Sequence, residues 1–164
     1  MMPEPAIYRH TQTGVLIWII SCLTIAILLI ALLLSLSQLK SAGAIYPSDQ
    51  TILLRLLGAM FVMGMTLALF FRLTVTVDDH YVRAVFGIGI IGKRVPLKAV
   101  AAVRPVTNPW WYGLGIHMIP GGWIWNLSGT KAIELKLKNG RLYRFGTDEP
   151  EVLTEIVRGK IFQI

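Results

Sequence analysis

The sequence has a single cysteine, Cys22, among 164 residues. One cysteine excludes an intrachain disulfide and a cysteine-based zinc site. Histidine is also scarce: His10, His80 and His117 lie in three different segments, and none has a second ligand at metal-binding spacing. We therefore expect no metal site, and we expect Cys22 to be a small residue at a helix contact.

Motifs for cofactor binding or nucleophilic catalysis are lacking as well. Gly87, Gly89 and Gly92 have the spacing of a dinucleotide fingerprint, but that fingerprint needs a following helix, and the next residues, KRVPL, do not form one. Ser128 has no histidine or acid at a motif spacing. His117 is expected inside a strand, as a hydrogen-bonded barrel residue. The sequence thus predicts no catalytic residue, no cofactor and a protein that is not an enzyme.

Charge is absent from residues 14–36, where Leu, Ile, Val and Ala dominate. At ~1.5 Å per residue this run is long enough for a hydrocarbon core of ~30 Å. A second apolar run, 52–71, contains only Arg55, near one end where a long side chain reaches the headgroups. Residues 14–72 are therefore expected to form a transmembrane helical hairpin. A cleaved signal peptide ending at Ala42-Gly43-Ala44 is the alternative, but the first apolar run is longer than a signal peptide requires.

Acidic residues are few, with 9 against 16 basic ones and a net charge of +7. Arg9 precedes the first span and Arg72 closes the second, whereas the connecting segment offers only Lys40. This asymmetry predicts a multi-pass protein of the cell (inner) membrane with both termini in the cytoplasm, residues 1–13 forming a cytoplasmic N-terminal segment. A tethered basic domain meets anionic lipid first, so nucleic acid is not an expected partner.

From residue 73 onward the pattern changes to short strands joined by tight turns, such as LTVTV, DDH and YVRAVF. In AIELKLKNGRLYRFG, Ile133, Leu135 and Leu137 alternate with charged residues including Glu134, which predicts a hairpin with its charged face outward. Asn139-Gly140 suits a type I′ turn. TDEPEVLTEIVRGK predicts a helix capped by Thr147 or Asp148, with one apolar stripe. Residues 73–164 are thus expected to hold about seven strands and a C-terminal helix.

The order of these elements, with WWYGLGIHMIPGGWIWNLSG and AIELKLKNGRLYRFGTDEPEVL, resembles bacterial pleckstrin-homology-like (PH-like) domains on small membrane proteins with a two-helix anchor. The resemblance implies a mainly-β, seven-stranded split barrel capped by a C-terminal helix. Members of that family largely lack an assigned biochemical function, and some assemble into rings, which implies homo-oligomers. Inositol phosphate recognition does not carry over, because the turn between the first two strands is Asp78-Asp79-His80 rather than basic. These three residues are expected to act as turn formers rather than to hold a cation.

Two groups of residues are candidates for contact with the membrane or a partner. The first is the apolar turn GIGII, with Ile88 and Ile90, together with the basic residues Lys93, Arg94 and Lys98. The second is Trp110, Trp111 and Tyr112, for which core packing, an interfacial anchor and a groove for a peptide or partner protein remain alternatives. Trp123 and Trp125 are expected to fill the core.

The sequence therefore predicts a membrane-anchored, non-enzymatic binding or scaffolding module. Its partners are the lipid bilayer and, as alternatives that the sequence leaves open, anionic lipid headgroups, a protein partner or a second copy. The competing hypothesis is an accessory subunit of a membrane enzyme or transporter complex. An intramembrane carboxylate or histidine favours that hypothesis, and neither span contains one.

Overall fold

The computed structural model describes residues 6–42 and 47–163. The chain divides into two compact units, Val15–Ala68 and the combination of Met1–Gly14 with Leu69–Ile164. The first is the helical unit and the second the β domain, each described here by itself.

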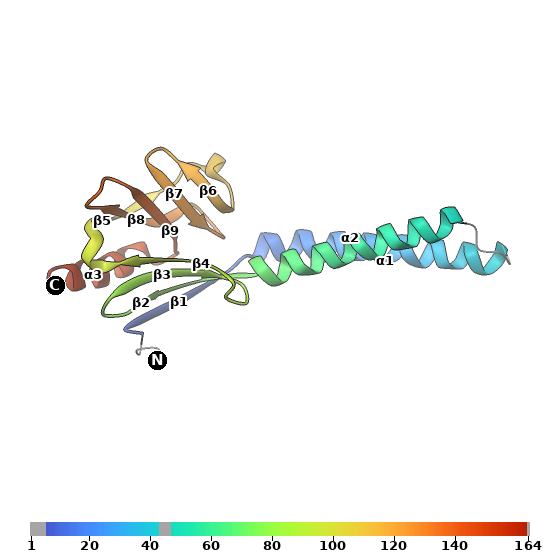
Figure 1. Ribbon diagram of the computed structural model, residues 1–164, viewed down its shortest axis with the longest axis horizontal. Coiled ribbons are helices and arrows are strands. Elements are labelled where there is room, and N and C mark those ends of the chain that lie inside the picture. The colour runs from blue at the N-terminus through green and yellow to red at the C-terminus, as the bar shows by residue number, and fades with distance from the viewer. Residues whose placement is uncertain (1–5, 43–46, 164) are drawn as a thin grey trace. The chain divides into compact units, whose positions relative to one another are not determined.

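The helical unit consists of α1, Val15–Ala42, and α2, Pro47–Phe70 (Figure 1). Residues Val15–Ser41 and Gln50–Phe70 are long and apolar enough to cross a membrane. Their large side chains are not covered by protein: Leu54 is 69% exposed and Phe61 is 71% exposed. A helix that is apolar on all sides needs an apolar environment, so these helices have the character of membrane spans rather than of a soluble core. Residues 43–46, which include Gly43-Ala44 of the signal-peptide alternative, lie outside the described residues.

A small residue is indeed buried in α1, but it is Ser21 and not Cys22. Ser21 is 4% exposed, whereas Cys22 is a free, exposed thiol. Consecutive helix positions point about 100° apart, so only one of two neighbours faces a given contact. The expectation that Cys22 lies at a helix contact is therefore wrong within this unit.

The β domain begins with a strand that the sequence analysis did not anticipate. Tyr8–Thr13 forms β1, which pairs antiparallel with β2, Arg72–Val77, from Tyr8 opposite Val77 to Thr13 opposite Arg72. Two further antiparallel strands, β3 at Tyr81–Phe86 and β4 at Ile91–Pro96, complete a sheet of order β1-β2-β3-β4. The N-terminal segment is thus an edge strand of the domain.

The second sheet has five strands in the order β5-β8-β9-β7-β6. Their bounds are β5 Val100–Thr107, β6 Gly115–Ile119, β7 Gly122–Asn126, β8 Lys131–Leu137 and β9 Leu142–Gly146. Short 3₁₀ turns, η1 at Leu97–Ala99 and η2 at Trp110–Tyr112, flank β5. The strands β7 and β9 are parallel, and all other pairs are antiparallel. Pro105 is tolerated in β5 because β5 is an edge strand.

The two sheets pack face to face around an aliphatic and aromatic core (Figure 1). Phe86 of β3 and Trp125 of β7 stack across the interface with ring centroids 5.9 Å apart. Phe86, Phe145, Leu73 and Leu97 are the largest side chains that are fully buried. The described residues form nine strands in two sheets, compared with the seven expected, because β1 joins from before the helices and β6 and β7 form a separate hairpin.

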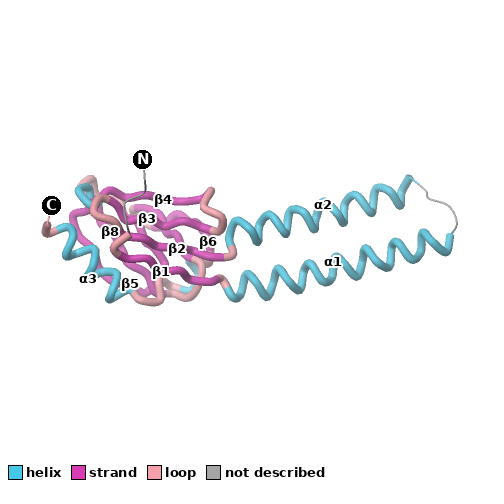
Figure 2. Tube along the Cα trace, turned by 90° about the horizontal axis from the view of Figure 1, so that it is seen from below, coloured by secondary structure: helices cyan, strands magenta, loops and turns pink. Residues whose placement is uncertain are grey.

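The C-terminal helix α3 spans Pro150–Ile161 and packs mainly on β5 (Figure 2). Leu153 and Val157 of its apolar stripe are fully buried, as expected, whereas Val152 is 49% exposed. The N-cap position is Glu149, one residue after Asp148 and two after Thr147, the two expected caps. The Thr147 hydroxyl still contributes, since its Oγ1 accepts a hydrogen bond from the Glu149 backbone N–H at 3.2 Å.

The β8–β9 hairpin is present, but its turn is not the expected type I′. That turn needs positive φ at both central residues, and among the described residues only glycines have positive φ, here Gly140 at 83°. The Gly140 N–H donates to the Leu137 carbonyl and the Leu137 N–H donates to the Arg141 carbonyl, each at 2.9 Å. The loop is thus a three-residue connection with glycine in the left-handed position.

Candidate functional site

Both connections between the β domain and the helices occur at one end of the four-stranded sheet. Thr13 pairs with Arg72, and only Gly14 separates Thr13 from α1, as only Phe71 separates α2 from Arg72. The β3–β4 turn, Gly87–Ile90, is at the same end, because the Gly87 N–H donates to the Arg72 carbonyl at 2.8 Å and Arg72 Nε donates to the Gly87 carbonyl at 3.2 Å. We call Thr13, Arg72 and this turn the junction end.

The junction end presents exposed apolar side chains. Ile88 is 59% exposed and Ile90 is 74% exposed. The ring of Phe86, which is buried, contacts the ring of Phe70, which is partly exposed, with centroids 5.4 Å apart. The two isoleucines are thus displayed on the turn that is hydrogen-bonded to Arg72, two residues after the end of α2.

The basic residues that the sequence groups with this turn do not share its position. Lys98 lies in η1, beyond the far end of β4, since Ile91 pairs with Phe86 and Pro96 with Tyr81. Lys93 and Arg94 are on opposite faces of β4: the Lys93 ammonium lies 4.7 Å from the Tyr143 ring centroid, and the Arg94 guanidinium lies 4.3 Å from that of Tyr81. Alternation along a strand separates neighbours in this way.

A row of basic side chains instead crosses the outer face of the four-stranded sheet. Arg9 pairs with Thr76, Thr76 with Arg83, and Arg83 with Arg94. Arg83 Nη2 forms an ion pair with Asp78 Oδ2 at 2.8 Å. The Asp78 Oδ1 also accepts backbone N–H groups of His80 and Tyr81, at 2.9 and 2.7 Å, which is the turn-forming role expected for this segment. Sequence reasoning missed this row because it depends on β1.

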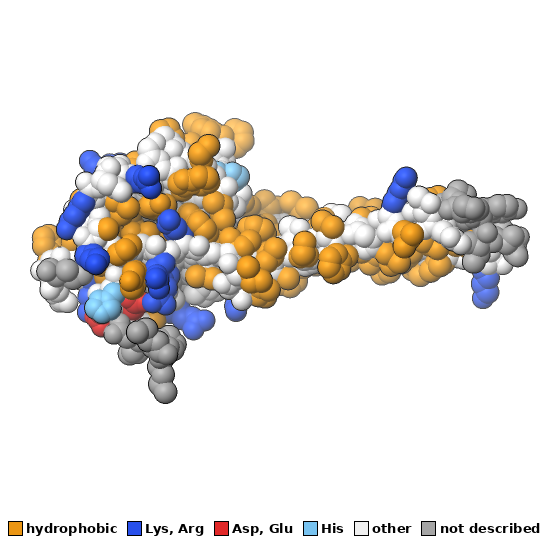
Figure 3. Space-filling view, in the orientation of Figure 1, with side chains coloured by type: hydrophobic (Ala, Val, Ile, Leu, Met, Phe, Trp, Pro, Cys, Tyr) orange, Lys and Arg blue, Asp and Glu red, His pale blue; other side chains and the backbone are white. Residues whose placement is uncertain are grey.

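The segment Trp110–Tyr112, here called the aromatic loop, carries two exposed tryptophans. Trp110 is 80% exposed and Trp111 is 67% exposed, and their rings contact each other edge to face. Tyr112 is partly covered and lies under Arg144, whose guanidinium is 5.8 Å from the ring centroid. Figure 3 shows hydrophobic side chains gathered over the β6–β7 part of the domain, and Met118 of β6 is 75% exposed. Core packing is therefore excluded for Trp110 and Trp111.

The expectation that Trp123 and Trp125 fill the core is wrong for Trp123, which is 43% exposed. Trp125 is partly buried and stacks on Phe86. His117 is also exposed rather than inside the domain, and its ring nitrogen contacts the Leu114 carbonyl. These residues lie in or beside β6, an edge strand that no further strand covers, so a strand pattern alone does not tell which positions are buried.

These exposures predict unequal costs for tryptophan replacement. Trp125→Ala should lower the free energy of unfolding by about 3 kcal/mol, because it removes a packed ring. Trp110→Ala and Trp111→Ala should each cost less than about 1 kcal/mol, since surface changes rarely cost more. Thermal unfolding of the full-length chain in detergent measures the difference, and equal losses for all three variants would contradict the exposures.

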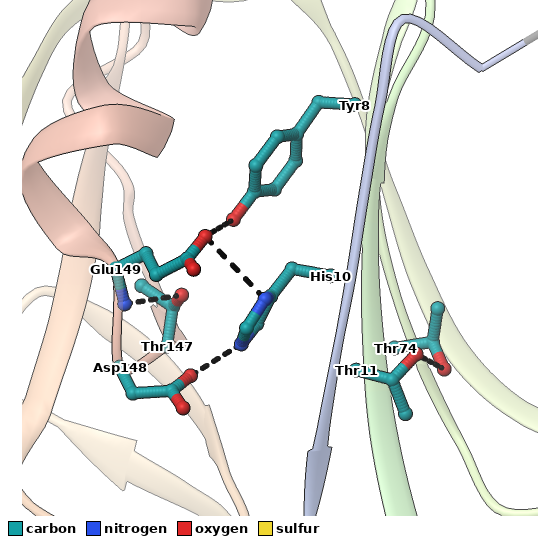
Figure 4. A network of polar contacts seen from close by, with 7 residues as sticks. All are labelled: Tyr8, His10, Thr11, Thr74, Thr147, Asp148 and Glu149. Atoms are coloured by element: carbon teal, nitrogen blue, oxygen red, sulfur yellow. Dashed lines mark hydrogen bonds and ion pairs between the residues drawn. The ribbon is translucent and has the colours of Figure 1, made fainter.

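A polar network joins β1 to the loop before α3 (Figure 4). The Tyr8 hydroxyl donates to Glu149 Oε2 at 3.1 Å. The His10 ring contacts Asp148 through Nε2 and lies 3.4 Å from Glu149 Oε2 through Nδ1. Burial, together with the hydrogen bond and charge of Glu149, raises the pKa of Tyr8 to about 12. This network fastens the N-terminal strand to the opposite side of the domain.

A second network surrounds Glu134 on β8. The alternating pattern predicts this residue on an outward charged face, but its side chain is only 5% exposed. Glu134 Oε1 accepts from Arg104 Nε and Nη2 at 2.8 and 2.7 Å, and Oε2 accepts from Arg144 Nε and Nη2 at the same distances. Arg144 Nη1 also donates to Asn108 Oδ1 at 2.9 Å. Arginines on both neighbouring strands allow the carboxylate to be buried, a pairing that the β8–β9 hairpin pattern alone does not reveal.

No protein-family model and no curated protein sequence matches this chain. In the described parts of the chain, no three residues of the His, Cys, Asp and Glu types come together as a metal-binding group.

Proposed function

We propose that this protein is a membrane-anchored binding or scaffolding module without enzymatic activity. In this proposal α1 and α2 cross the cell (inner) membrane, both termini are cytoplasmic, and the two-sheet domain with its closing helix is PH-like. The Lys and Arg asymmetry supports the orientation, and the sequence resemblance supports the family.

The observation that carries the proposal is the composition of the junction end. The pairing of Thr13 with Arg72 places the residues that lead into α1 and out of α2 opposite each other in one sheet. If the helices span a bilayer, Thr13 and Arg72 are at headgroup level, and so is the Gly87–Ile90 turn that is hydrogen-bonded to Arg72. Exposed isoleucines beside an arginine suit that level, where apolar side chains insert and cationic ones meet phosphates.

A fluorescent label tests this contact directly. In a Cys22→Ser background, an environment-sensitive dye on Ile90→Cys should emit at shorter wavelength in bilayer nanodiscs than the same dye on Lys98→Cys, which lies at the other end of β4. A lipid-depth quencher should quench the first dye and spare the second. Equal emission and quenching at the two positions would refute membrane contact by the turn.

The alternative, an accessory subunit of a membrane enzyme or transporter complex, has its own support in the aromatic loop. Trp110, Trp111 and Met118 form an exposed apolar surface, and aromatic residues and methionine are enriched in protein interfaces. Both proposals share the anchor, and they differ in whether this surface binds a larger assembly.

A further inference from the structure

A partly open cavity of about 500 Å³ lies beside the last residues of β1. Its wall is made by residues 11–13 of β1, residues 128–131 before and at the start of β8, and Thr147 with Asp148 before α3. This volume is within the range of small-molecule sites. None of the residues discussed for membrane contact at the Gly87–Ile90 turn contributes to it.

The wall combines a buried amide with a lysine. Gln12 is only 7% exposed, and its Oε1 is buried without a hydrogen bond. Buried polar atoms are nearly always paired, so this amide marks a polar site directly behind the cavity surface. Lys131 forms no ion pair with any residue that the structure describes, and its ammonium is an available cation.

The wall also contains a carboxylate that stays ionised. Burial raises the pKa of Asp148, but hydrogen bonds from its own backbone N–H, from His10 and from Gln12, with the charge of His10, outweigh this effect and lower the pKa overall. The cavity thus has a free cation at Lys131 and a carboxylate acceptor at Asp148, which the Gln12 side chain supports. A ligand with only one sign of charge would be repelled by either Lys131 or Asp148, whereas a zwitterion can pair with both residues.

One residue of the cavity wall lies close in the sequence to the start of α1. Thr13 lines it, and Gly14 alone separates Thr13 from Val15, the first residue of α1. If α1 spans the membrane, as in the proposed function on which this inference rests, the zwitterions within reach are phospholipid headgroups.

We infer that this cavity binds the phosphoethanolamine group, a phosphodiester joined to a primary ammonium. Lys131 contacts the phosphate, and hydroxyls of Thr13 and Ser128 add donors to it. Asp148 accepts N–H groups of the ammonium, and Gln12 positions that carboxylate through its side-chain hydrogen bond. A primary ammonium has three N–H donors, whereas the trimethylammonium of phosphatidylcholine has none, so the lining distinguishes the two lipids.

Lipid titration of the full-length protein in detergent micelles, read by native mass spectrometry, tests the inference. Phosphatidylethanolamine should bind roughly ten-fold more tightly than phosphatidylcholine, since hydrogen bonds to a charged donor are at stake. The mono- and dimethylated headgroups should fall between them. This series changes only the ligand, so it needs no variant that must fold.

Two variants and a matched control locate the binding. Lys131→Gln should weaken phosphatidylethanolamine binding by roughly ten-fold, and Gln12→Leu should remove the preference over phosphatidylcholine. Lys138→Gln removes the same charge from the exposed β8–β9 turn and should change nothing. Equal binding of both lipids, or a preference that neither Lys131→Gln nor Gln12→Leu alters, would overturn the inference.

Soluble glycerophosphoethanolamine separates the two sources of this chemistry. If the lipid is the ligand, the soluble compound should compete with it only at far higher concentration. If the protein binds the soluble compound but not the lipid, the cavity recognises phosphoethanolamine and its ligand is a free metabolite. If the protein binds neither compound, the proposed site is refuted. The lipid titration uses micelles and does not require a bilayer. A negative titration therefore leaves the Ile90 label experiment unaffected, and a negative label experiment leaves the lipid titration interpretable.

Discussion

Replacing Gly122 by alanine should prevent the β domain from folding stably. A Cβ at this position would be 1.7 Å from the Leu142 carbonyl oxygen and 2.5 Å from its carbon. These are backbone atoms of the parallel neighbour β9, so no side-chain rotation relieves the contact and β7 must move away. We expect a loss above about 3 kcal/mol, beyond the usual cost of overpacking, from a total that is typically about 5–15 kcal/mol. Thermal unfolding of the full-length chain in detergent, followed by near-ultraviolet circular dichroism, measures it.

Gly159→Ala in α3 is the matched control. Nothing lies within 4 Å of a Cβ built at Gly159, and alanine favours a helix interior by about 1 kcal/mol over glycine. This variant should melt at a higher temperature than the parent chain. A Gly122→Ala protein that melts like the parent would show that β7 and β9 do not approach as closely as described.

Removal of the Glu134 carboxylate should have the second largest effect. Glu134→Ala leaves Arg144, whose side chain is only 17% exposed, without its anionic partner. Breaking a buried ion pair from one side costs about 3–5 kcal/mol. Arg104 binds the same carboxylate but is 69% exposed, so Arg104→Met should cost about 1 kcal/mol or less. If the two variants are equally stable in thermal unfolding, the network does not depend on burial.

The Glu134 network also predicts how the stability of the protein changes as the pH falls. Burial raises the pKa of Glu134, but hydrogen bonds from Arg144 and Arg104 outweigh it, and the pKa is lowered from its ordinary 4.5. A group with a lowered pKa in the folded state contributes stability above its ordinary pKa and loses it as the pH falls. The parent chain should therefore lose stability more steeply below about pH 4.5 than Glu134→Ala does. If the free energies of unfolding of the two proteins fall equally steeply with decreasing pH, the prediction is contradicted.

The elements with strong apolar periodicity could be predicted from sequence. The two apolar helices and α3 each have a hydrophobic pattern that decides the structure locally. The strand β1 could not be predicted, because YRHTQT contains no run of β-forming apolar residues and gains its order from pairing with β2, about 60 residues later. The β8–β9 turn was misassigned because Asn139-Gly140 suits more than one hairpin loop.

The candidate site could be predicted only where it depends on one segment. The exposed Ile88 and Ile90 follow from a short apolar stretch between glycines, whereas the exposure of Trp110 and Trp111 was only one of the alternatives that the sequence left open. The cavity beside Gln12 and the pairing of Glu134 combine residues from three separate segments. No spacing in the sequence indicates that such residues meet, because only the sheet register sets them side by side.

The pairing of Thr13 with Arg72 also constrains how the protein is made. Seen from the sheet, α1 and α2 are one insertion inside a β-hairpin, so β1 leaves the ribosome long before its partner. At ~5–20 residues per second the delay is roughly 3–12 s, during which β1 lacks that partner. If α1 and α2 cross a membrane as proposed, the two strands meet only when the helices insert in opposite directions, since an inverted α1 would leave β1 across the bilayer from β2. Under that proposal, completion of the sheet depends on correct insertion, and a wrongly inserted chain keeps an open β2 edge.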